Sequence, residues 1–331
     1  MAWVSPRVTV LMPVWNAIRF VRPAMDSVLR QSFESFEVVV IDDGSTDGTG
    51  DVVREFGDPR VRVVRNEMRR GLVYALNVGL GLARGEYIAR MDGDDVSHPE
   101  RFAAQVRFLD TERNIALVGT WANVINETGD VVGVMRVPTS SCEIYETLLM
   151  KNVFIHPSVM FRRRAVQELG GYQPVRANTE LAQDYHLWLR LADRYSLANL
   201  AEVLIDYRMH RDQVSMRRLV AQLRSADLAR RMAAKRRAEH GRPGGGPRRL
   251  RLIERLRGER GSLGGECLFL CDVYGSAENR WIVLRLAWQA LLSSPLSRQA
   301  WDRAGRELAR RMLEARGVRT LRDWLAGRGS T

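Results

Sequence analysis

Short apolar runs rich in β-branched residues alternate with helix-like stretches over the first 110 residues of the chain. The strand-like runs cover residues 8–14, 36–41, 61–64 and 87–91, and the helix-like stretches between them cover residues 18–31, 46–56 and 71–83. Strands that alternate with helices predict βαβ units, a mostly parallel central sheet and right-handed crossovers. We therefore expect an α/β fold in which the residues that follow each strand meet at one edge of the sheet.

The pattern changes after residue 115. Two strand-like runs flank a turn-like segment at residues 127–130, which predicts antiparallel pairing. Further along, we expect helices at residues 98–112 and 181–192 and strands at residues 115–125, 131–137, 154–161 and 200–208. From Met216 onward the sequence is helical in character and rich in arginine, and a Gly/Pro-rich loop interrupts it at residues 241–247.

The net charge of +12 belongs to the C-terminal third of the chain. Residues 216–331 hold 26 Lys and Arg against 11 Asp and Glu, a net charge of +15, whereas residues 1–215 have a net charge of −3. This division predicts two functional units, a domain at residues 1–215 and a basic, arginine-rich helical region at residues 216–331. A nucleic-acid-binding protein would carry its basic residues on the N-terminal sheet, so we expect no nucleic-acid partner.

The segment DDGSTDGT at residues 42–49 directly follows the second predicted strand. A carboxylate such as Asp42 at that position can accept hydrogen bonds from a nucleobase or from ribose hydroxyls, because open α/β sheets bind ligands beyond the carboxyl ends of their strands. The alternative is a simple turn with Ser45 or Thr46 capping the next helix.

Three carboxylates occur within the four residues Asp92–Gly–Asp–Asp95, after the fourth predicted strand. Gathering such charges is costly unless a cation neutralises them. Mg²⁺ and Mn²⁺ prefer oxygen ligands and are often held by one or two carboxylates plus the phosphates of a substrate. We therefore predict a divalent-metal site, with a solvated acidic turn as the alternative.

Asp184 lies in the first turn of the predicted helix at residues 181–192. A helix N-terminus favours the anionic form of a carboxyl group, so Asp184 would remain a ready proton acceptor. Helix capping explains an aspartate at this position equally well. Farther along the chain, His210 could ligate a metal or contact a phosphate, or it could have a purely structural role.

Five motifs in this order resemble the family 2 glycosyltransferases of the GT-A fold. They are PVWN at residues 13–16, DDGSTD at 42–47, DGDD at 92–95, HP at 156–157 and QD at 183–184. The resemblance covers roughly residues 5–215 and implies a GT-A type nucleotide-sugar-binding domain with a mostly parallel central sheet. The helical C-terminal region would follow that domain.

The resemblance also implies roles for individual residues. Pro13, Trp15 and Asp42 would line the nucleoside pocket, and Asn66 would lie near the donor. Asp92 and Asp94 would form the D-x-D element, with Asp94 as the metal ligand. Asp184 would be the catalytic base of an inverting, single-displacement transfer. Members of the family usually have Glu before that aspartate, whereas this chain has Gln183, which removes one charge and keeps the base.

The expected substrates are a nucleoside-diphosphate sugar, with UDP as the commonest donor nucleotide of the family, and a glycan or lipid-linked acceptor. A nucleotidyltransferase is the nearest other class, but it usually has a Gly-rich basic loop after its first strand, where this chain has Pro13–Asn16. An NAD-dependent dehydrogenase is excluded more simply, because no G-x-G-x-x-G follows that strand.

The expected location is cytoplasmic. The N-terminus has no pattern of a signal peptide, no apolar run reaches the roughly 20 residues that span a bilayer, and the three cysteines have no regular spacing. Residues 281–292 and 301–316 are amphipathic, with tryptophans on one face and arginines around it. These segments predict either packing on the catalytic domain or peripheral contact with the inner face of the membrane.

Overall fold

The computed structural model describes residues 5–176, 180–210 and 219–239. The chain divides into two compact units, Met1–Ile253 and Glu254–Thr331, and every described residue belongs to the first unit. The amphipathic segments 281–292 and 301–316 lie outside the described residues. Within the described part of the chain, no helix is both long enough and apolar enough to cross a membrane.

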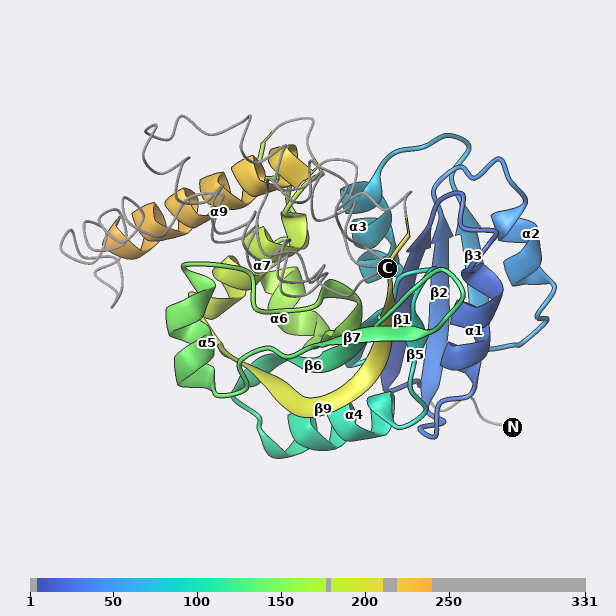
Figure 1. Cartoon of the computed structure of the whole chain (residues 1–331), viewed down its shortest axis with the longest axis horizontal. Helices are drawn as coiled ribbons and strands as arrows, with labels where there is room; N and C mark the ends of the chain where they lie inside the picture. The colour runs from blue at the N-terminus through green and yellow to red at the C-terminus, as the bar shows by residue number, and fades with distance from the viewer. Residues whose placement is uncertain (1–4, 177–179, 211–218, 240–331) are drawn as a thin grey trace, which may run out of the picture. The chain divides into compact units, whose positions relative to one another are not determined.

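The first half of the sheet has the predicted parallel βαβ architecture (Figure 1). Four neighbouring strands run parallel in the order β3-β2-β1-β4. Their bounds are β1 Val8–Val14, β2 Phe36–Asp42, β3 Val61–Arg65 and β4 Tyr87–Arg90, with the helices α1 Val21–Leu29, α2 Thr49–Arg54 and α3 Leu72–Leu82 between them. The helices begin up to three residues later than the sequence pattern predicts, because the residues after each strand first form the loops of the candidate site.

The second half of the sheet mixes the two strand directions. β8 (Met160–Arg162) runs antiparallel to both β4 and β6 (Ile115–Ile125), whereas β9 (Ser196–Arg208) runs parallel to β6. β7 (Val131–Met135) pairs antiparallel with β6, as the turn between them predicts. β5 (Val96–Ser97) is a two-residue strand that pairs with β9 and has no counterpart in the sequence prediction.

The predicted strand at residues 154–161 is shorter in the structure. Residues His156–Ser158 form a 3₁₀ turn, η1, and only the residues from Met160 onward join the sheet. Pro157 has no N–H to donate to a neighbouring strand, so the hydrogen-bond pattern between two strands cannot continue through it. The other described helices are α4 Arg101–Thr111, α5 Ser141–Leu148, α6 Arg163–Glu168, α7 Gln183–Ala192 and α9 Leu219–Glu239.

The sheet has an apolar core on each face. One core joins α3, α5, α6, α7 and α9 to one set of strand side chains, which includes Leu11, Val39 and Ile41. The other joins α1, α2 and α4 to the alternate set, which includes Val10, Met12 and Val40. Successive strand residues point to opposite faces, so unbroken apolar runs such as β1 and β2 supply both cores. The result is a three-layer α/β/α arrangement (Figure 1).

Helix α9 packs against α7 (Figure 1). Its buried positions Ser225, Ala229, Ala233 and Arg237 recur every four residues and so form one stripe along the helix. The small side chains of the first three allow the two helix backbones to approach closely. α9 belongs to the basic region predicted at residues 216–331, and it is part of the same compact unit as the sheet.

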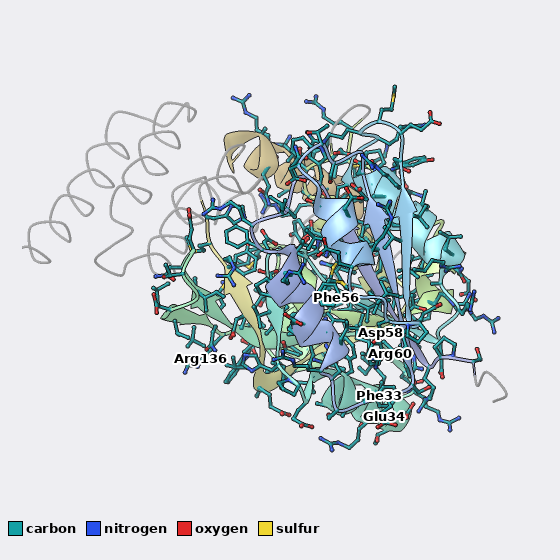
Figure 2. The ribbon with its side chains drawn as sticks, turned by 90° about the vertical axis from the view of Figure 1, so that its right-hand side faces the viewer. Phe33, Glu34, Phe56, Asp58, Arg60 and Arg136 are labelled. Carbon is teal, nitrogen blue, oxygen red and sulfur yellow. The ribbon has the colours of Figure 1, made fainter. Side chains whose placement is uncertain are left out.

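The amino ends of β2 and β3 form the end of the parallel sheet opposite the candidate site. Phe33, Glu34, Asp58 and Arg60 lie there (Figure 2). The Nη2 atom of Arg60 lies 2.7 Å from Oδ2 of Asp58, and the guanidinium group lies 4.5 Å from the centre of the Phe36 ring. These contacts fix the turn that leads into β3.

Candidate active site

The carboxyl ends of β1, β2 and β3 lie level with one another. Val14 is in register with Asp42, and Asp42 is in register with Arg65. The loops that follow these strands therefore leave the sheet side by side. This alignment brings the PVWN motif, the DDGSTD motif and Asn66 to one edge of the sheet, where the sequence predicts a nucleotide-binding region.

Asp43 organises this edge. Its Oδ1 atom accepts hydrogen bonds from the Asn66 side chain at 2.7 Å and from the Arg70 backbone N–H at 2.8 Å, and its Oδ2 atom accepts one from the Gly71 N–H at 2.7 Å. One carboxylate thus fixes the loop between β3 and α3. Gly44 has a φ of +73°, and a Cβ there would lie 2.7 Å from the Arg69 backbone nitrogen, so only glycine permits this close approach.

The predicted nucleoside-pocket residues occupy different depths at this edge. Pro13 is buried within β1, whereas Trp15 just beyond it is 44% exposed. The guanidinium carbon of Arg69 lies 3.6 Å from the centre of the Trp15 ring. An exposed indole with a cation on one side is a surface on which a planar base can stack.

Asp42 is fully buried beneath the loop. Its Oδ1 atom accepts a hydrogen bond from the Ser45 N–H at 2.9 Å, and its Oδ2 atom has no hydrogen-bond partner among the described residues. The Nε atom of Arg65 lies 3.7 Å from that oxygen. Asp42 therefore shapes the turn, and its Oδ2 atom keeps its capacity to accept a hydrogen bond. The predicted cap by Ser45 or Thr46 is wrong, because α2 begins after Gly48 and no side chain caps it.

The acidic motif lies in the loop after β4. Oxygen atoms of Asp92, Asp94 and Asp95 lie within 4.8 Å of one another. Burial and the neighbouring carboxylates raise the pKa of Asp95 well above its usual value, and burial raises that of Asp92. A Cβ at Gly93 would lie 2.9 Å from Cγ1 of Val14, so this glycine lets the acidic loop pack under the end of β1.

Residues at and just after the end of β9 form hydrogen bonds with the acidic loop. The Arg208 N–H donates to Oδ1 of Asp95 at 2.7 Å, and Nε of Arg208 donates to the Asp94 carbonyl at 2.8 Å. Nε2 of His210 lies 2.9 Å from Oδ2 of Asp94. The structure therefore brings together the two residues that the sequence proposes as metal ligands.

These residues fit a divalent cation. The Oδ2 atom of Asp95 and the Nδ1 atom of His210 are buried and have no hydrogen-bond partner among the described residues. Buried polar atoms are normally satisfied, so these two atoms beside three carboxylates have the chemistry to accept a cation. A cation would also oppose the burial and the mutual repulsion that together raise the pKa values of Asp92 and Asp95.

Asp184 lies in the first turn of α7, as predicted, and is half-buried. Its Oδ2 atom accepts a hydrogen bond from the Asn152 side chain at 3.1 Å. Burial raises the pKa of Asp184, although the hydrogen bonds from the helix N-terminus and from Asn152 act in the opposite direction. The helix N-terminus alone predicts a lowered pKa for Asp184, whereas burial has the larger effect and raises it.

Arg90 is a buried cation beside the acidic loop. Its side chain is 1% exposed, and its Nη2 atom donates to Oδ1 of Asp92 at 2.5 Å. The charge of Arg90 lowers the pKa of both Asp92 and Asp184. The charges of those same two aspartates both raise the pKa of the buried Tyr172 phenol. Arg90 and Tyr172 therefore lie near enough to both Asp92 and Asp184 to interact electrostatically with each of them.

His156 contacts Tyr172. Its Nε2 atom lies 3.3 Å from the Tyr172 hydroxyl, and its ring centre lies 5.9 Å from that of Trp188 on α7. Burial lowers its pKa well below the usual value for histidine, so the ring is neutral. The HP motif thus packs against Tyr172 and against Trp188 of α7, the helix that carries Asp184.

Comparison with known proteins identifies the family of this chain. The sequence pattern of glycosyl transferase family 2 matches residues 9–170. EpsE of Bacillus subtilis is 34% identical over 220 residues, which cover 65% of this chain and 76% of that protein. The chain belongs to glycosyl transferase family 2. This member is also similar to the amylovoran biosynthesis glycosyltransferase AmsE of Erwinia amylovora, at 33% identity over 59% of this chain and 72% of the relative.

Solved structures confirm the GT-A fold of this family 2 glycosyltransferase. TarS of S. aureus, residues 1–349 in complex with UDP-GlcNAc, superposes with a TM-score of 0.53 at 19% identity, over 70% of this chain and 71% of TarS. The mannosyltransferase PcManGT from Pyrobaculum calidifontis, in complex with GDP-Man and Mn²⁺, gives a TM-score of 0.53 at 22% identity. That match covers 92% of this chain and 81% of PcManGT.

The sequence analysis did not single out three residues that the structure places in the site, Asp43, Arg90 and Asn152. Arg90 had a usable signal, because a charged residue inside an otherwise apolar strand, directly before an acidic motif, is costly unless it has a partner there. Asp43 and Asn152 had none, since their partners lie 23 to 32 residues away in the sequence.

Proposed function

We propose that this glycosyltransferase is an inverting enzyme that moves a sugar from a nucleoside-diphosphate donor to an acceptor hydroxyl. The observation that carries the proposal is the pair of separate carboxylate sites, Asp184 on α7 and the acidic loop after β4, in which Asp184 and Asp92 interact electrostatically with the same two buried side chains, Arg90 and Tyr172. Two carboxylate sites in different environments can perform two different tasks.

In the proposed reaction, Asp184 accepts the proton of the acceptor hydroxyl while that oxygen attacks the anomeric carbon of the donor. The bond from that carbon to the diphosphate breaks, and the nucleoside diphosphate leaves from the opposite face of the sugar. Burial raises the pKa of Asp184, which makes it a stronger base than an exposed aspartate. The Asn152 hydrogen bond fixes the orientation of the carboxylate.

The proposed metal is Mn²⁺ or Mg²⁺, held by Asp94 with His210 and supported by Asp92. A bound divalent cation would neutralise charge on the departing diphosphate. The supporting evidence is the hydrogen-bonding distance between Asp94 and His210 and the unsatisfied buried atoms beside them. The structurally similar PcManGT is a complex with Mn²⁺.

For the donor, we propose that Trp15 stacks on the base and that Pro13, Asp42 and Asn66 form the remainder of the nucleoside pocket. Trp15 is the exposed member of this set, and Asp43 fixes Asn66 beside it. UDP is the proposed nucleotide, which the UDP-GlcNAc complex of TarS supports, whereas PcManGT is a complex with GDP-Man.

The proposed acceptor is a glycan or a lipid-linked glycan of a polysaccharide or cell-envelope pathway. The names of two relatives support this class, since AmsE is an amylovoran biosynthesis glycosyltransferase and WbnJ of Escherichia coli is an O-antigen biosynthesis glycosyltransferase. WbnJ is 30% identical over 61% of this chain and 80% of its own length.

A screen of donor hydrolysis tests the proposal directly. The purified protein is incubated with UDP-, GDP-, CMP- and dTDP-sugars, with Mn²⁺ or with a chelator, and release of the free nucleotide is measured. We expect metal-dependent release from one nucleoside-diphosphate sugar, and a sugar product whose anomeric configuration is inverted. Release from none of the donors, or retention of the configuration, would contradict the proposal.

Peripheral contact with the cytoplasmic face of the membrane is the proposed role of the amphipathic segments in residues 254–331. The experiment compares flotation of the full chain and of a 1–253 protein with anionic and neutral vesicles. We expect the full chain alone to float, only with anionic vesicles and less at high salt. Equal behaviour of the two proteins would leave packing on the catalytic domain as the explanation.

A further inference from the structure

A basic hollow lies among the end of α6, the C-terminal end of α7 and the last turns of α9. It has a volume of about 350 Å³, at the lower end of the size range of ligand pockets. Its charged lining consists of four arginines and two carboxylates, Arg190, Arg194, Arg236, Arg237, Glu168 and Asp193. It lies at the opposite end of α7 from Asp184, so it is separate from the candidate active site.

The two carboxylates do not balance the arginines. Both oxygens of Asp193 are already engaged, Oδ1 by Arg237 at 2.7 Å and Oδ2 by Arg236 at 3.1 Å. Glu168 accepts hydrogen bonds from Arg164 and from the Tyr195 hydroxyl, both at 2.8 Å. The hollow therefore keeps an excess of positive charge.

Arg237 is the clearest sign of a missing anion. Its side chain is 1% exposed, and the guanidinium group lies 4.5 Å from the centre of the Tyr145 ring. Its Nη1 and Nη2 atoms are buried and have no hydrogen-bond partner among the described residues. A buried guanidinium normally satisfies its donors, and its charge acts strongly in a region of low dielectric constant.

The other arginines differ in how firmly they are held. Arg190 is 9% exposed and donates hydrogen bonds to the backbone carbonyls of Gly171 and Leu169. These bonds fix its side chain in the lining of the basic hollow. Burial and the charges of Arg236 and Arg194 lower the pKa of Arg190 to about 10, which reflects the mutual repulsion in the hollow. Arg194 is exposed at its rim. A polyanion would relieve this repulsion.

We propose that the basic hollow binds a phosphate-type anion, either a free phosphate or diphosphate or the phosphate headgroup of a lipid. Planar guanidinium groups match the oxygens of a phosphate and form strong charge-assisted hydrogen bonds with them. The small-residue stripe of α9 has a role in this site, because the close packing of α9 on α7 brings Arg236 and Arg237 beside Arg190.

The test measures binding of phosphate and of pyrophosphate to the full chain by calorimetry. The buffer is freed of divalent cations with a chelating resin, and saturating UDP is present in a parallel series, so that binding in the donor site is recognised. The test variant is Arg194→Gln with Arg236→Gln. The control is Arg224→Gln with Arg231→Gln, which removes the same charge from exposed positions of α9.

We expect saturable anion binding that UDP does not displace. The test variant should lower the affinity for the anion by about tenfold or more, and the control should change it by less than about twofold. Arg194→Glu, at an exposed position, serves as a second variant and should weaken binding at least as strongly. Absence of saturable binding, or equal weakening in the control, would overturn the proposal.

A second arm distinguishes the source of the phosphate. Phosphatidylcholine vesicles with and without phosphatidic acid are mixed with the full chain and with both double variants. A loss of phosphatidic-acid binding in the test variant that the control does not share identifies a lipid headgroup. Pyrophosphate binding together with equal vesicle binding by all three proteins identifies a free anion. Failure in both arms rejects the site and leaves the glycosyl-transfer proposal untouched, because no residue of the hollow belongs to that site.

Discussion

Nε2 of His210 lies 2.9 Å from Oδ2 of Asp94, although the two residues are 116 positions apart in the sequence. The contact exists because β9 runs beside β5 and ends next to the acidic loop, where Arg208 binds Asp94 and Asp95 through its backbone and side chain. The end of one strand thus supplies both the Arg208 hydrogen bonds and the His210 contact to the acidic loop.

The metal proposal predicts that Asp94→Ala abolishes the metal dependence of UDP binding, because the cation would connect this carboxylate to the diphosphate. His210→Gln should weaken Mn²⁺ affinity by roughly 10- to 100-fold, the usual effect of losing a supporting ligand. Calorimetry with UDP and Mn²⁺ measures both changes. His98→Gln is the control, since His98 forms a similar 2.7 Å pair with Asp206. Equal UDP affinity with and without chelator would refute the metal site.

Asp184→Asn should reduce the rate of sugar transfer by roughly 100- to 10,000-fold, the range expected for removal of a general base. The side chain keeps its size and its position at the start of α7, so the affinity for the nucleotide should change little. Single-turnover transfer and nucleotide calorimetry measure the two quantities. A nearly normal transfer rate would show that another group accepts the proton.

Asn152→Ala should move the acid limb of the pH profile of kcat/KM to higher pH. The hydrogen bond from Asn152 lowers the pKa of Asp184, so its removal raises a pKa that burial already raises. The base must be deprotonated to act, and a higher pKa therefore costs activity on the acid side while the rate at high pH is retained. An unchanged limb would mean that Asp184 does not control it.

His156 should make the protein less stable in acid. The buried ring stays neutral in the folded state, whereas the unfolded chain binds a proton below about pH 6.5. The unfolded state therefore takes up more protons as the pH falls, and the free energy of unfolding decreases by up to about 1.4 kcal/mol per pH unit. His156→Gln should remove this part of the pH dependence of the free energy of unfolding, which urea unfolding at a series of pH values measures. If the free energy of unfolding decreases equally steeply with falling pH in both proteins, His156 is not a buried neutral histidine.

Ala233→Leu should destabilise the protein by about 1–3 kcal/mol, because the position is fully buried where α9 packs on α7 and has no room for a larger side chain. Ala238→Leu on the exposed side of the same helix is the matched control and should change the free energy of unfolding by less than about 0.5 kcal/mol. Urea unfolding distinguishes the two. Equal effects would mean that α9 does not pack as described.

The sequence by itself determined the parallel half of the sheet and the positions of the site motifs along it. Apolar runs and the helices between them are local patterns, and parallel strands necessarily bring the loops after β1, β2 and β4 to one edge. For this reason the acidic loop and the loop around Asp43 lie together as predicted. The short strand β5 and the helices α5 and α6 were missed, because short elements depend on packing rather than on a local pattern.

Only the tertiary structure decided the electrostatics of the site. The sequence places Asp184 at a helix N-terminus, which lowers a carboxyl pKa, but folding also buries it, and burial has the larger effect and raises the pKa. The structure likewise pairs Asp94 with His210 and Arg90 with Asp92. Burial and pairing depend on contacts between distant segments, and a local sequence pattern carries no information about which distant charge will lie beside it.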